Sequence, residues 1–351
     1  MSSTVHVVGA GIAGLTAALV LARRGHAVRV WERSDGTGGC THHGGGMLAP
    51  VSELDHGEAW VADLGHDSAA RWRALLPDAP REVLATDGLL VVAHRPEWPL
   101  LDEHVDRAVR AGHGARVERV DAAGIAAREP LLAGRFHRGL WLAGEGRVDP
   151  RRLRRVLLRE LDAAGATVRL GVEVDPARDR RRGGPLDGVV VDARGLAAPD
   201  LDLRPVRGEY VLLRAPAVTL RHPVRVAHPR YPLYAIPRGE GLVYVGATQV
   251  ESGHEGPPQA RSVLELLSAL YGLHPAFAEA EVVELGVGHR PARPDHRPVI
   301  APREGGLALN GLFRHGFLFA PVLAEAVADR LEGRAIDPRV SPFVAEAACA
   351  C

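Results

Sequence analysis

Short apolar runs and one longer apolar stretch alternate at the start of the chain. Residues 4–8 and 28–32 are short runs rich in valine, which are typical of buried strands. Between them, residues 15–24 are mostly apolar, and Gly25 follows as a suitable residue for ending a helix. A strand, a helix and a second strand in this order predict a β-α-β unit, and such a unit implies a parallel sheet.

Further apolar segments predict strands and helices along the rest of the chain. Strands are expected at residues 88–93, 167–174, 188–192, 207–213, 242–246 and 307–309, and helices at residues 64–76, 150–164, 260–271 and 318–331. Residues 102–128 combine helix and loop, and residues 229–237 contain prolines and tyrosines. Asp149 is the expected N-cap of the helix that Pro150 opens. Because nucleotide-fold patterns occur at both ends of the chain, we expect two interleaved domains.

Length and composition fit a two-domain protein and exclude several partners. The 351 residues exceed the size of most single domains, and 46% of them are hydrophobic. The 43 basic residues are balanced by 43 acidic residues, so nucleic acid and acidic membranes are not expected partners. No run of about 18 apolar residues occurs, so no membrane span is expected. The first residues fit a strand and helix better than a signal peptide, and we therefore expect a cytoplasmic protein.

Lysine is absent, and all 43 basic residues are arginines. This excludes lysine Schiff-base chemistry and the lysine of a P-loop. The three cysteines, Cys40, Cys349 and Cys351, lack metal-site spacing with histidines, and the adjacent His42 and His43 point in different directions. We therefore expect no metal site, and we interpret the two C-terminal cysteines as part of a flexible end rather than a redox or metal-binding tail.

The clearest local motif is a glycine-rich turn, Gly9-x-Gly11-x-x-Gly14, between the first strand and the first helix. Gly9 permits a tight turn, Gly11 lets the backbone approach a pyrophosphate, and Gly14 lets helix and strand pack closely. Glu32 lies 18 residues after Gly14, where a carboxylate can accept hydrogen bonds from ribose hydroxyls. The motif does not separate NAD from FAD, but Glu32 argues against NADP because it would repel a 2′-phosphate.

Several later segments carry a resemblance to a known family. They are Cys40–Pro50, His228–Tyr234, Gly246–Thr248, Gly288–Pro291 and Asn310–Leu318. With them the chain resembles the glycine oxidase (ThiO) family, within the D-amino-acid oxidase superfamily, from Val5 to about Leu331. Two departures concern the substrate: Gln249 stands where the family motif often has methionine, and the loop at residues 40–43 is one residue shorter than in some relatives.

The resemblance implies an α/β fold with two interleaved domains and FAD bound without a covalent link. A Rossmann-type FAD-binding domain would comprise residues 1–75, 144–205 and 285–351, and a smaller substrate domain would comprise residues 76–143 and 206–284. The antiparallel sheet of the substrate domain would cover the flavin. The resemblance further implies a homo-oligomer, commonly a tetramer.

The resemblance also implies which residues meet the cofactor. The matching positions are Ile12, Ala13, Glu32 and Arg33 at the ADP half, Val174 at the adenine, Thr41 in the flavin-proximal loop, Gly45, Gly46 and Met47 along the isoalloxazine ring, and Leu312, Phe313, Arg314, His315, Gly316, Phe317 and Leu318 under the flavin pyrimidine. Backbone N–H groups at the start of the final helix would stabilise negative charge near flavin N1.

Three side chains match substrate-contacting positions of the family: Arg290, Arg314 and Tyr234. An arginine is a natural anchor for a carboxylate because it is permanently charged and bidentate. Tyr234 could donate its phenol proton to the same carboxylate, with Tyr231 as its nearby competitor. A general base is not required if hydrogen leaves Cα as hydride, so the protein would mainly orient and desolvate the substrate.

The reaction implied by the resemblance is oxidation of a small amino acid, with glycine as first choice, to its imine. O₂ would be reduced to H₂O₂, and the imine would enter the thiazole branch of thiamine biosynthesis. A D-amino-acid dehydrogenase with another electron acceptor stays open, as does a Rossmann-type binding protein without turnover. A sarcosine oxidase-like enzyme is a further alternative, but its covalent flavin needs a cysteine near Leu312–Leu318, and this segment has none.

Overall fold

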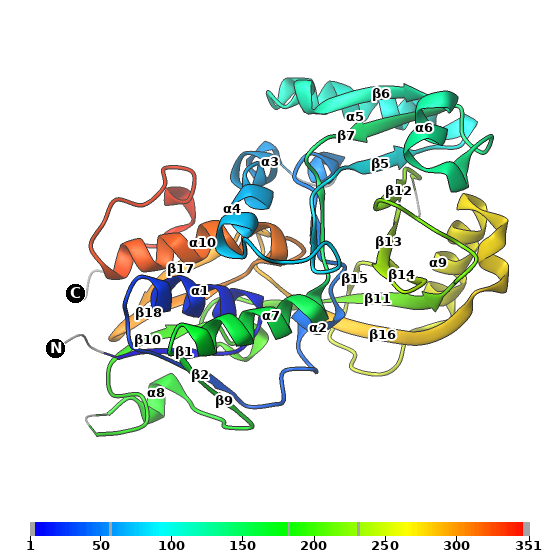
Figure 1. Cartoon of the computed structure of the whole chain (residues 1–351). Coiled ribbons are helices and arrows are strands. Elements are labelled where there is room, and N and C mark those ends of the chain that lie inside the picture. Colours follow the sequence, from blue (N-terminus) through cyan, green and yellow to red (C-terminus); the bar gives the residue numbers. More distant parts are fainter. Residues whose placement is uncertain (1–3, 56–57, 182, 230–231, 347–351) are drawn as a thin grey trace.

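The structure is a computed structural model that describes residues 4–55, 58–181, 183–229 and 232–346 (Figure 1). Tyr231, Cys349 and Cys351, which the sequence analysis singles out, lie outside these ranges. Within these ranges no helix is long and apolar enough to cross a bilayer. The same ranges contain no group of three or more His, Cys, Asp or Glu side chains that could hold a metal ion.

In the described part of the chain, six strands form one sheet that is parallel except at one edge. In spatial order they are β17 (Val299–Arg303), β18 (Gly306–Asn310), β10 (Val189–Asp192), β1 (Val5–Val8), β2 (Val28–Glu32) and β9 (Thr167–Leu170). Only β17 runs antiparallel to its described neighbour. All four residues of β1 are buried, because it lies inside the sheet. The predicted β-α-β unit is confirmed, and the carboxyl ends of its strands meet at one edge.

Three helices pack together beside this sheet (Figure 1): α1 (Ile12–Arg23), α7 (Pro150–Ala163) and α10 (Gly316–Leu331). α1 contacts both of the others, and most of its side chains are buried. α7 is amphipathic and buries residues at helical spacing, among them Leu153, Leu157 and Leu161. Asp149 caps α7 by accepting hydrogen bonds from the backbone N–H groups of Arg151 and Arg152, as the sequence predicts.

A second, larger sheet is mostly antiparallel. Its strands are β15 (Val250–Glu251), β11 (Arg204–Arg214), β14 (Leu242–Gly246), β13 (Leu233–Gly239), β12 (Val224–Val226), β5 (Leu89–Val92), β7 (Arg138–Leu142), β6 (Val117–Asp121) and, paired along β11, β16 (Glu281–Ala292). A small sheet contains β3 (Met47–Leu48), β8 (Gly146–Val148) and β4 (Leu84–Ala85). The α/β class with a parallel and an antiparallel sheet is therefore confirmed.

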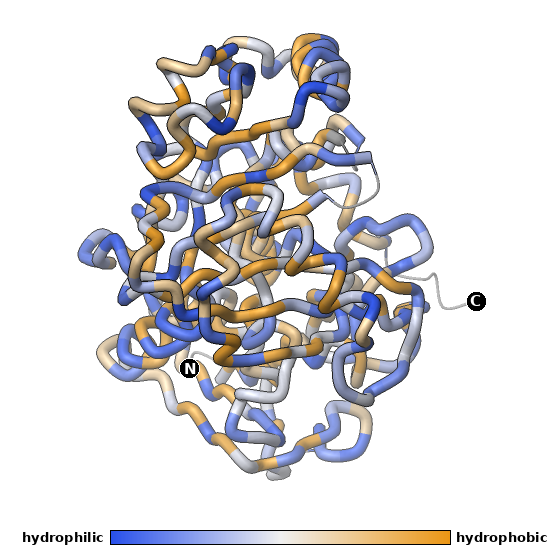
Figure 2. The backbone as a smooth tube through the Cα atoms, turned by 90° about the vertical axis from the view of Figure 1, so that its right-hand side faces the viewer, coloured by the Kyte–Doolittle hydropathy of each residue, from blue (hydrophilic) through white to orange (hydrophobic). Residues whose placement is uncertain are grey.

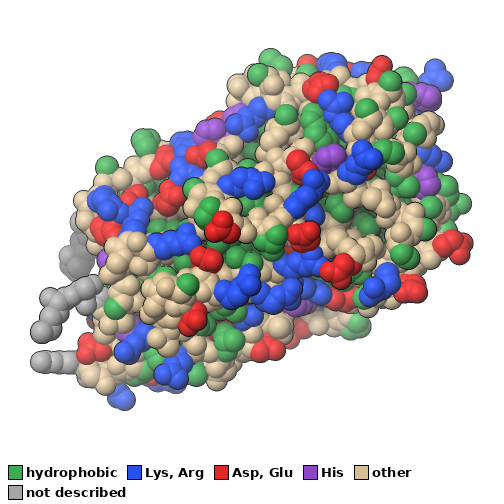
Figure 3. All heavy atoms as spheres, viewed as in Figure 1, with side chains coloured by type: hydrophobic (Ala, Val, Ile, Leu, Met, Phe, Trp, Pro, Cys, Tyr) green, Lys and Arg blue, Asp and Glu red, His purple; other side chains and the backbone are tan. Residues whose placement is uncertain are grey.

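The remaining helices cover the second sheet and fill the connections. They are α2 (Cys40–His43), α3 (Ala59–Gly65), α4 (Ser68–Leu75), α5 (Trp98–Arg110), α6 (Ala122–Arg128), α8 (Pro176–Asp179) and α9 (Ala260–Leu273). Figure 2 shows hydrophobic residues along the strands in the centre of the view and hydrophilic residues in many outer loops. On the face seen in Figure 3, acidic and basic side chains are interspersed, in keeping with a formal net charge of zero.

Several elements begin or end differently from the prediction. α1 begins at Ile12, three residues before Leu15, because Gly11 caps the helix in extended conformation and Gly14 is accommodated in its first turn. β9 ends at Leu170, short of the predicted residue 174, because Gly171 has a φ of +73° and turns the chain out of the sheet.

The predicted helix at residues 64–76 is two helices, α3 and α4, which are separated at His66 and Asp67. The residues directly before Arg290 are expected to form a strand, and the structure confirms it but extends it to Ala292 as β16, although Gly286, Gly288 and Pro291 interrupt its apolar pattern. Pairing with β11 along its whole length makes this segment a strand. The domain boundary predicted at residue 285 falls inside β16.

Candidate functional site

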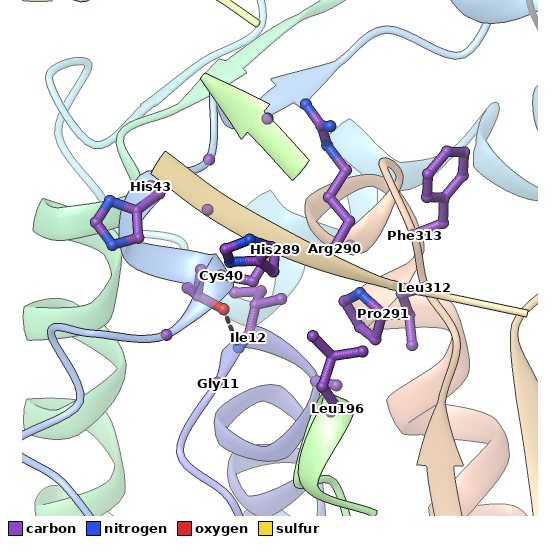
Figure 4. A pocket seen from close by; sticks show the side chains of 18 of the residues that line it. Gly11, Ile12, Cys40, His43, Leu196, His289, Arg290, Pro291, Leu312 and Phe313 are labelled. Atoms are coloured by element: carbon purple, nitrogen blue, oxygen red, sulfur yellow. Dashed lines mark hydrogen bonds between the residues drawn. The ribbon is translucent and has the colours of Figure 1, made fainter. Parts of the chain in front are cut away.

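A cavity of about 780 Å³ lies where the carboxyl edge of the parallel sheet meets the antiparallel sheet. Sites for cofactor-sized ligands span roughly 300–1,000 Å³. Residues from β1, β2 and the loop after β10 line one part of the cavity, and residues from β13, β14 and β16 line another. Figure 4 shows side chains from several of these elements converging on it. The cavity also coincides with the edge at which ligands bind in open parallel sheets.

The glycine-rich turn forms the floor of the cavity at the N-terminus of α1. Gly9 has a φ of +106°, which favours glycine, and a Cβ on Gly14 would lie 1.9 Å from the carbonyl oxygen of Gly9. Gly14 does not line the cavity. Its missing side chain lets α1 pack closely against the turn. The backbone N–H of Ile12 donates to Thr41 Oγ1 at 2.9 Å, shown as the dashed line in Figure 4. The helix start thus supplies donors and a positive dipole end to this region.

Glu32 lies at the end of β2 beside this turn. Its Oε2 accepts a hydrogen bond from the backbone N–H of Ala10 at 2.9 Å, and its Oε1 accepts from the N–H and hydroxyl groups of Ser34. Arg33 and Val174 line the same end of the cavity. The residues expected at the ADP half therefore lie together at one end.

The loop after β2 lines the middle of the cavity through its glycines. A Cβ on Gly44 would lie 2.7 Å from the ring of Phe317, and one on Gly46 would lie 2.1 Å from the carbonyl oxygen of Val148. A Cβ on Gly45 would meet Ile236 and Tyr244 at 3.2–3.3 Å. Side chains at these three positions would collide with or crowd the neighbouring groups. The loop therefore has glycines here and exposes its backbone to the cavity.

The N-terminal end of α10 lines a further side of the cavity, next to Ile12 at the start of α1. Leu312, Phe313, Arg314, Gly316 and Phe317 line the cavity there. His315 and Leu318 do not line it, although both were expected to contact the cofactor. His315 packs against aromatic rings, including Phe319, and Leu318 occupies the space beside Gly65. Backbone N–H groups of the helix start are therefore the groups available on this side for negative charge.

The cavity fits a dinucleotide with a flat ring system. The glycine turn, the carboxylate of Glu32 and the bare backbone at Gly44–Gly46 occur in the order that such a ligand requires from one end to the other. The glycines at these lining positions place no side chain in the cavity.

Arg290 is a half-buried cation at the far end of the cavity. It projects from β16 beside Phe313, away from Ile12 (Figure 4). Its Nη1 donates to the carbonyl oxygen of Thr248 at 3.1 Å, and Gly208 leaves room for the guanidinium on β11. Burial, and then the positive charge of Arg314, lower its pKa. Among the described residues no carboxylate forms an ion pair with Arg290, so this cation can receive an anion from outside the chain.

Tyr234 and Arg314 meet at a buried carboxylate that sequence reasoning missed, Glu53. The hydroxyl of Tyr234 donates to Glu53 Oε1 at 2.9 Å, and Arg314 Nη2 lies 2.9 Å from Glu53 Oε2. Burial, and then the negative charge of Glu53, raise the pKa of Tyr234 well above its ordinary value. Arg314 Nη1 also donates to Gln249 Oε1 at 3.2 Å. The three predicted substrate residues thus lie in one part of the cavity.

Arg225 is a second residue that the sequence analysis missed. It is buried on β12, lines the cavity and lies 5.8 Å from the ring of Tyr234. An arginine between two valines in Val224–Val226 breaks an apolar strand pattern, and this signal could have identified it. Glu53 offered a weaker signal, namely an acidic residue only six positions after Met47 of the flavin-proximal loop.

Protonation of His315 should make the fold less stable in acid. Burial lowers its pKa to about 4 from an ordinary 6.5. Between these two values the unfolded chain takes up a proton that the folded chain does not, so stability falls as the pH falls from 6.5 towards 4. At pH 5 this residue should reduce the free energy of unfolding by about 2 kcal/mol relative to pH 7. Urea unfolding of the apoprotein at both pH values should show a smaller loss in His315→Gln; equal losses would contradict the assignment.

Comparisons with known proteins agree with this geometry. The family described as FAD dependent oxidoreductase (DAO) matches residues 4–330. A Rhizobium etli protein, whose name assigns it to thiamine biosynthesis as the oxidoreductase ThiO, is 42% identical over 328 residues, which cover 92% of this chain and 94% of the relative. Glycine oxidase of Pseudomonas aeruginosa is 30% identical over 369 residues, with 97% and 98% covered. The crystal structure of glycine oxidase from Geobacillus kaustophilus superimposes with a TM-score of 0.83 at 27% identity, covering 99% of each chain.

Proposed function

This chain belongs to the DAO family of FAD-dependent oxidoreductases, and we propose that it oxidises glycine, or a similar small amino acid, to the imine. The observation that carries the proposal is Arg290, a half-buried guanidinium that donates to carbonyl oxygens and forms no ion pair with a carboxylate of the described chain. A bound amino-acid carboxylate would supply the missing charge. The names of two relatives, both glycine oxidases, support glycine as the first substrate to test.

FAD would be held without a covalent bond by the residues that line the cavity. Gly9, Gly11, Ile12 and Ala13 would hold the pyrophosphate at the start of α1, and Glu32 would accept from the adenosine ribose. Gly45, Gly46 and Met47 would lie against the isoalloxazine ring, and below its pyrimidine part would lie Leu312, Phe313, Arg314, Gly316 and Phe317. When bound, FAD supplies N5 as acceptor for the hydride that leaves the substrate Cα and passes the electrons to O₂, giving H₂O₂.

Residues of the antiparallel sheet would orient the substrate. Arg290 would bind the carboxylate, and its position on β16 is fixed by the pairing of this strand with β11. Tyr234 would stand beside the substrate, although in this structure its hydroxyl donates to Glu53 rather than to the cavity. Tyr244 and Ile236 would exclude water from the reacting carbon, since both line the cavity and are buried.

The name of one relative supports a proposal for the biological setting. We propose that the imine enters the thiazole branch of thiamine biosynthesis, because the Rhizobium etli relative is named for that pathway. The enzyme would act in the cytoplasm on a free amino acid and O₂, and it would form a homo-oligomer, with a tetramer as the state to test.

An anaerobic titration with glycine, followed by air, tests the proposal. The flavin absorbance band of the purified protein should bleach as glycine is added and should return with H₂O₂ when air is admitted. Bleaching that air does not reverse would favour a dehydrogenase. A yellow protein that glycine leaves unchanged would contradict glycine as substrate, and sarcosine and small D-amino acids would then be tested in the same way.

A further inference from the structure

The proposed hydride transfer does not require the carboxylate of Glu53. Its side chain is buried, with 7% of the residue exposed, and it lines the far end of the cavity together with Tyr234, Arg290 and Arg314. Hydride removal from Cα needs no carboxylate there, and a buried carboxylate is costly unless it is paired. Its presence beside the anion site therefore calls for a reason.

Arg290 and Arg314, which both line the cavity, differ in their partners. Arg314 lies 2.9 Å from Glu53 Oε2 and donates to Gln249 Oε1, so its charge is matched and its orientation is held on two sides. Arg290 donates to backbone carbonyl oxygens and is unmatched by any carboxylate among the described residues. Of these two arginines, Arg290 is thus the one that can still offer an uncompensated charge to an incoming anion.

We infer that Glu53 is a specificity-determining residue, which restricts the site to substrates with a single carboxylate by neutralising Arg314. This inference rests on the proposed function, because it assumes that Arg290 binds the substrate carboxylate. A second carboxylate on the substrate would have to approach Arg314 next to Glu53. Two carboxylates in contact with the same guanidinium repel each other strongly. Tyr234 stabilises the arrangement, since its hydroxyl donates to the other oxygen of the same carboxylate.

Gln249, which stands where the family motif often has methionine, also contacts Arg314. Methionine, which the family motif often has here, could not accept a hydrogen bond from Arg314 with comparable strength. Gln249 therefore holds Arg314 without changing the charge of the cavity, whereas Glu53 both holds and neutralises it.

Binding of two unreactive carboxylates to the holoenzyme tests the inference without turnover. Glycolate has one carboxylate and malonate has two, and each dissociation constant is measured from the change in the flavin absorbance spectrum. The wild-type protein should bind glycolate at least about tenfold more tightly than malonate. In Glu53→Gln the dissociation constant of malonate should fall at least about tenfold, while that of glycolate changes by less than about threefold. The double variant Glu53→Gln/Arg314→Gln should lose this gain.

Two further variants separate charge from other effects. Glu255→Gln removes an exposed carboxylate that lines the same cavity and should leave the ratio of the two dissociation constants unchanged. Gln249→Met removes a neutral partner of Arg314 and should shift the ratio by less than about threefold. A shift as large as that of Glu53→Gln in either variant would contradict neutralisation by Glu53.

The inference is overturned if wild-type protein binds malonate as tightly as glycolate, or if Glu53→Gln keeps the wild-type ratio. Should Glu53→Gln fail to fold, Arg314→Gln provides the test, because an unpaired Glu53 should weaken malonate relative to glycolate still further. A ratio that stays the same or moves towards malonate in Arg314→Gln would also overturn it. If glycine fails to bleach the flavin, the proposed substrate is wrong. The ratio of the glycolate and malonate dissociation constants is measured independently of that outcome.

Discussion

Replacing Arg290 by alanine should lower kcat/KM for glycine by about 30-fold to several thousand-fold, which corresponds to about 2–5 kcal/mol lost when a buried charge pair loses one partner. The substrate carboxylate would lose its cationic partner in a site where Arg314 is already matched by Glu53. FAD binding should be unchanged, because Arg290 lies on β16, away from the glycine turn of α1.

Stopped-flow reduction of the flavin by glycine, together with the FAD content of each purified protein, measures both parts of this result. Arg293→Ala is a matched control, since Arg293 lies three positions further along the chain and does not line the cavity. Arg290→Lys should recover part of the loss, because it restores the charge but not the bidentate geometry. Wild-type kcat/KM in Arg290→Ala would remove this residue from the substrate site.

The nucleotide-binding half of the fold could be predicted from local sequence patterns. The strand at β1, the glycine turn and the strand at β2 are consecutive, so their spacing alone determines a β-α-β unit. The N-cap at Asp149 was predictable for the same reason, because a capping side chain binds backbone groups two or three residues away.

The antiparallel half was less predictable because its strands depend on partners far away in the sequence. β16 pairs with β11, which lies about 75 residues earlier, and its own residues include glycines and a proline that weaken the strand pattern. β13 likewise forms within a segment rich in proline and tyrosine, next to β14. The end of β16 and the whole of β13 cannot be recognised without knowing what lies beside them.

The same limit applies to the candidate site. The positions of Arg290, Arg314 and Tyr234 followed from a family resemblance, and the structure brings all three to one end of the cavity, while their catalytic roles stay predictions. Glu53 gave only a weak local signal, because its importance comes from contacts with residues about 180 and 260 positions later in the chain. Pairing of charges between distant segments is a tertiary property that no local pattern contains.

Replacing Gly14 by alanine should prevent FAD binding and destabilise the apoprotein by about 3 kcal/mol or more, as expected when an added methyl group meets atoms that cannot move away easily. The new Cβ would lie 1.9 Å from the carbonyl oxygen of Gly9 and 3.1 Å from its carbonyl carbon. Because both atoms belong to the backbone of the same turn, α1 would have to move away from β1. The N-terminus of α1 would then leave the position in which it can face a pyrophosphate.

Thermal unfolding of the apoprotein and quenching of FAD fluorescence separate the two effects in this turn. Gly38→Ala is the control for stability, since a Cβ there meets no other group within 4 Å. Gly11→Ala should behave differently from Gly14→Ala, because its Cβ would contact Thr41 Oγ1 at an ordinary 3.4 Å. We expect Gly11→Ala to keep wild-type apoprotein stability and to bind FAD more weakly, since the methyl group would stand where the pyrophosphate approaches the backbone. Wild-type FAD affinity in Gly14→Ala would show that the helix start does not have to be held against β1 for the cofactor to bind.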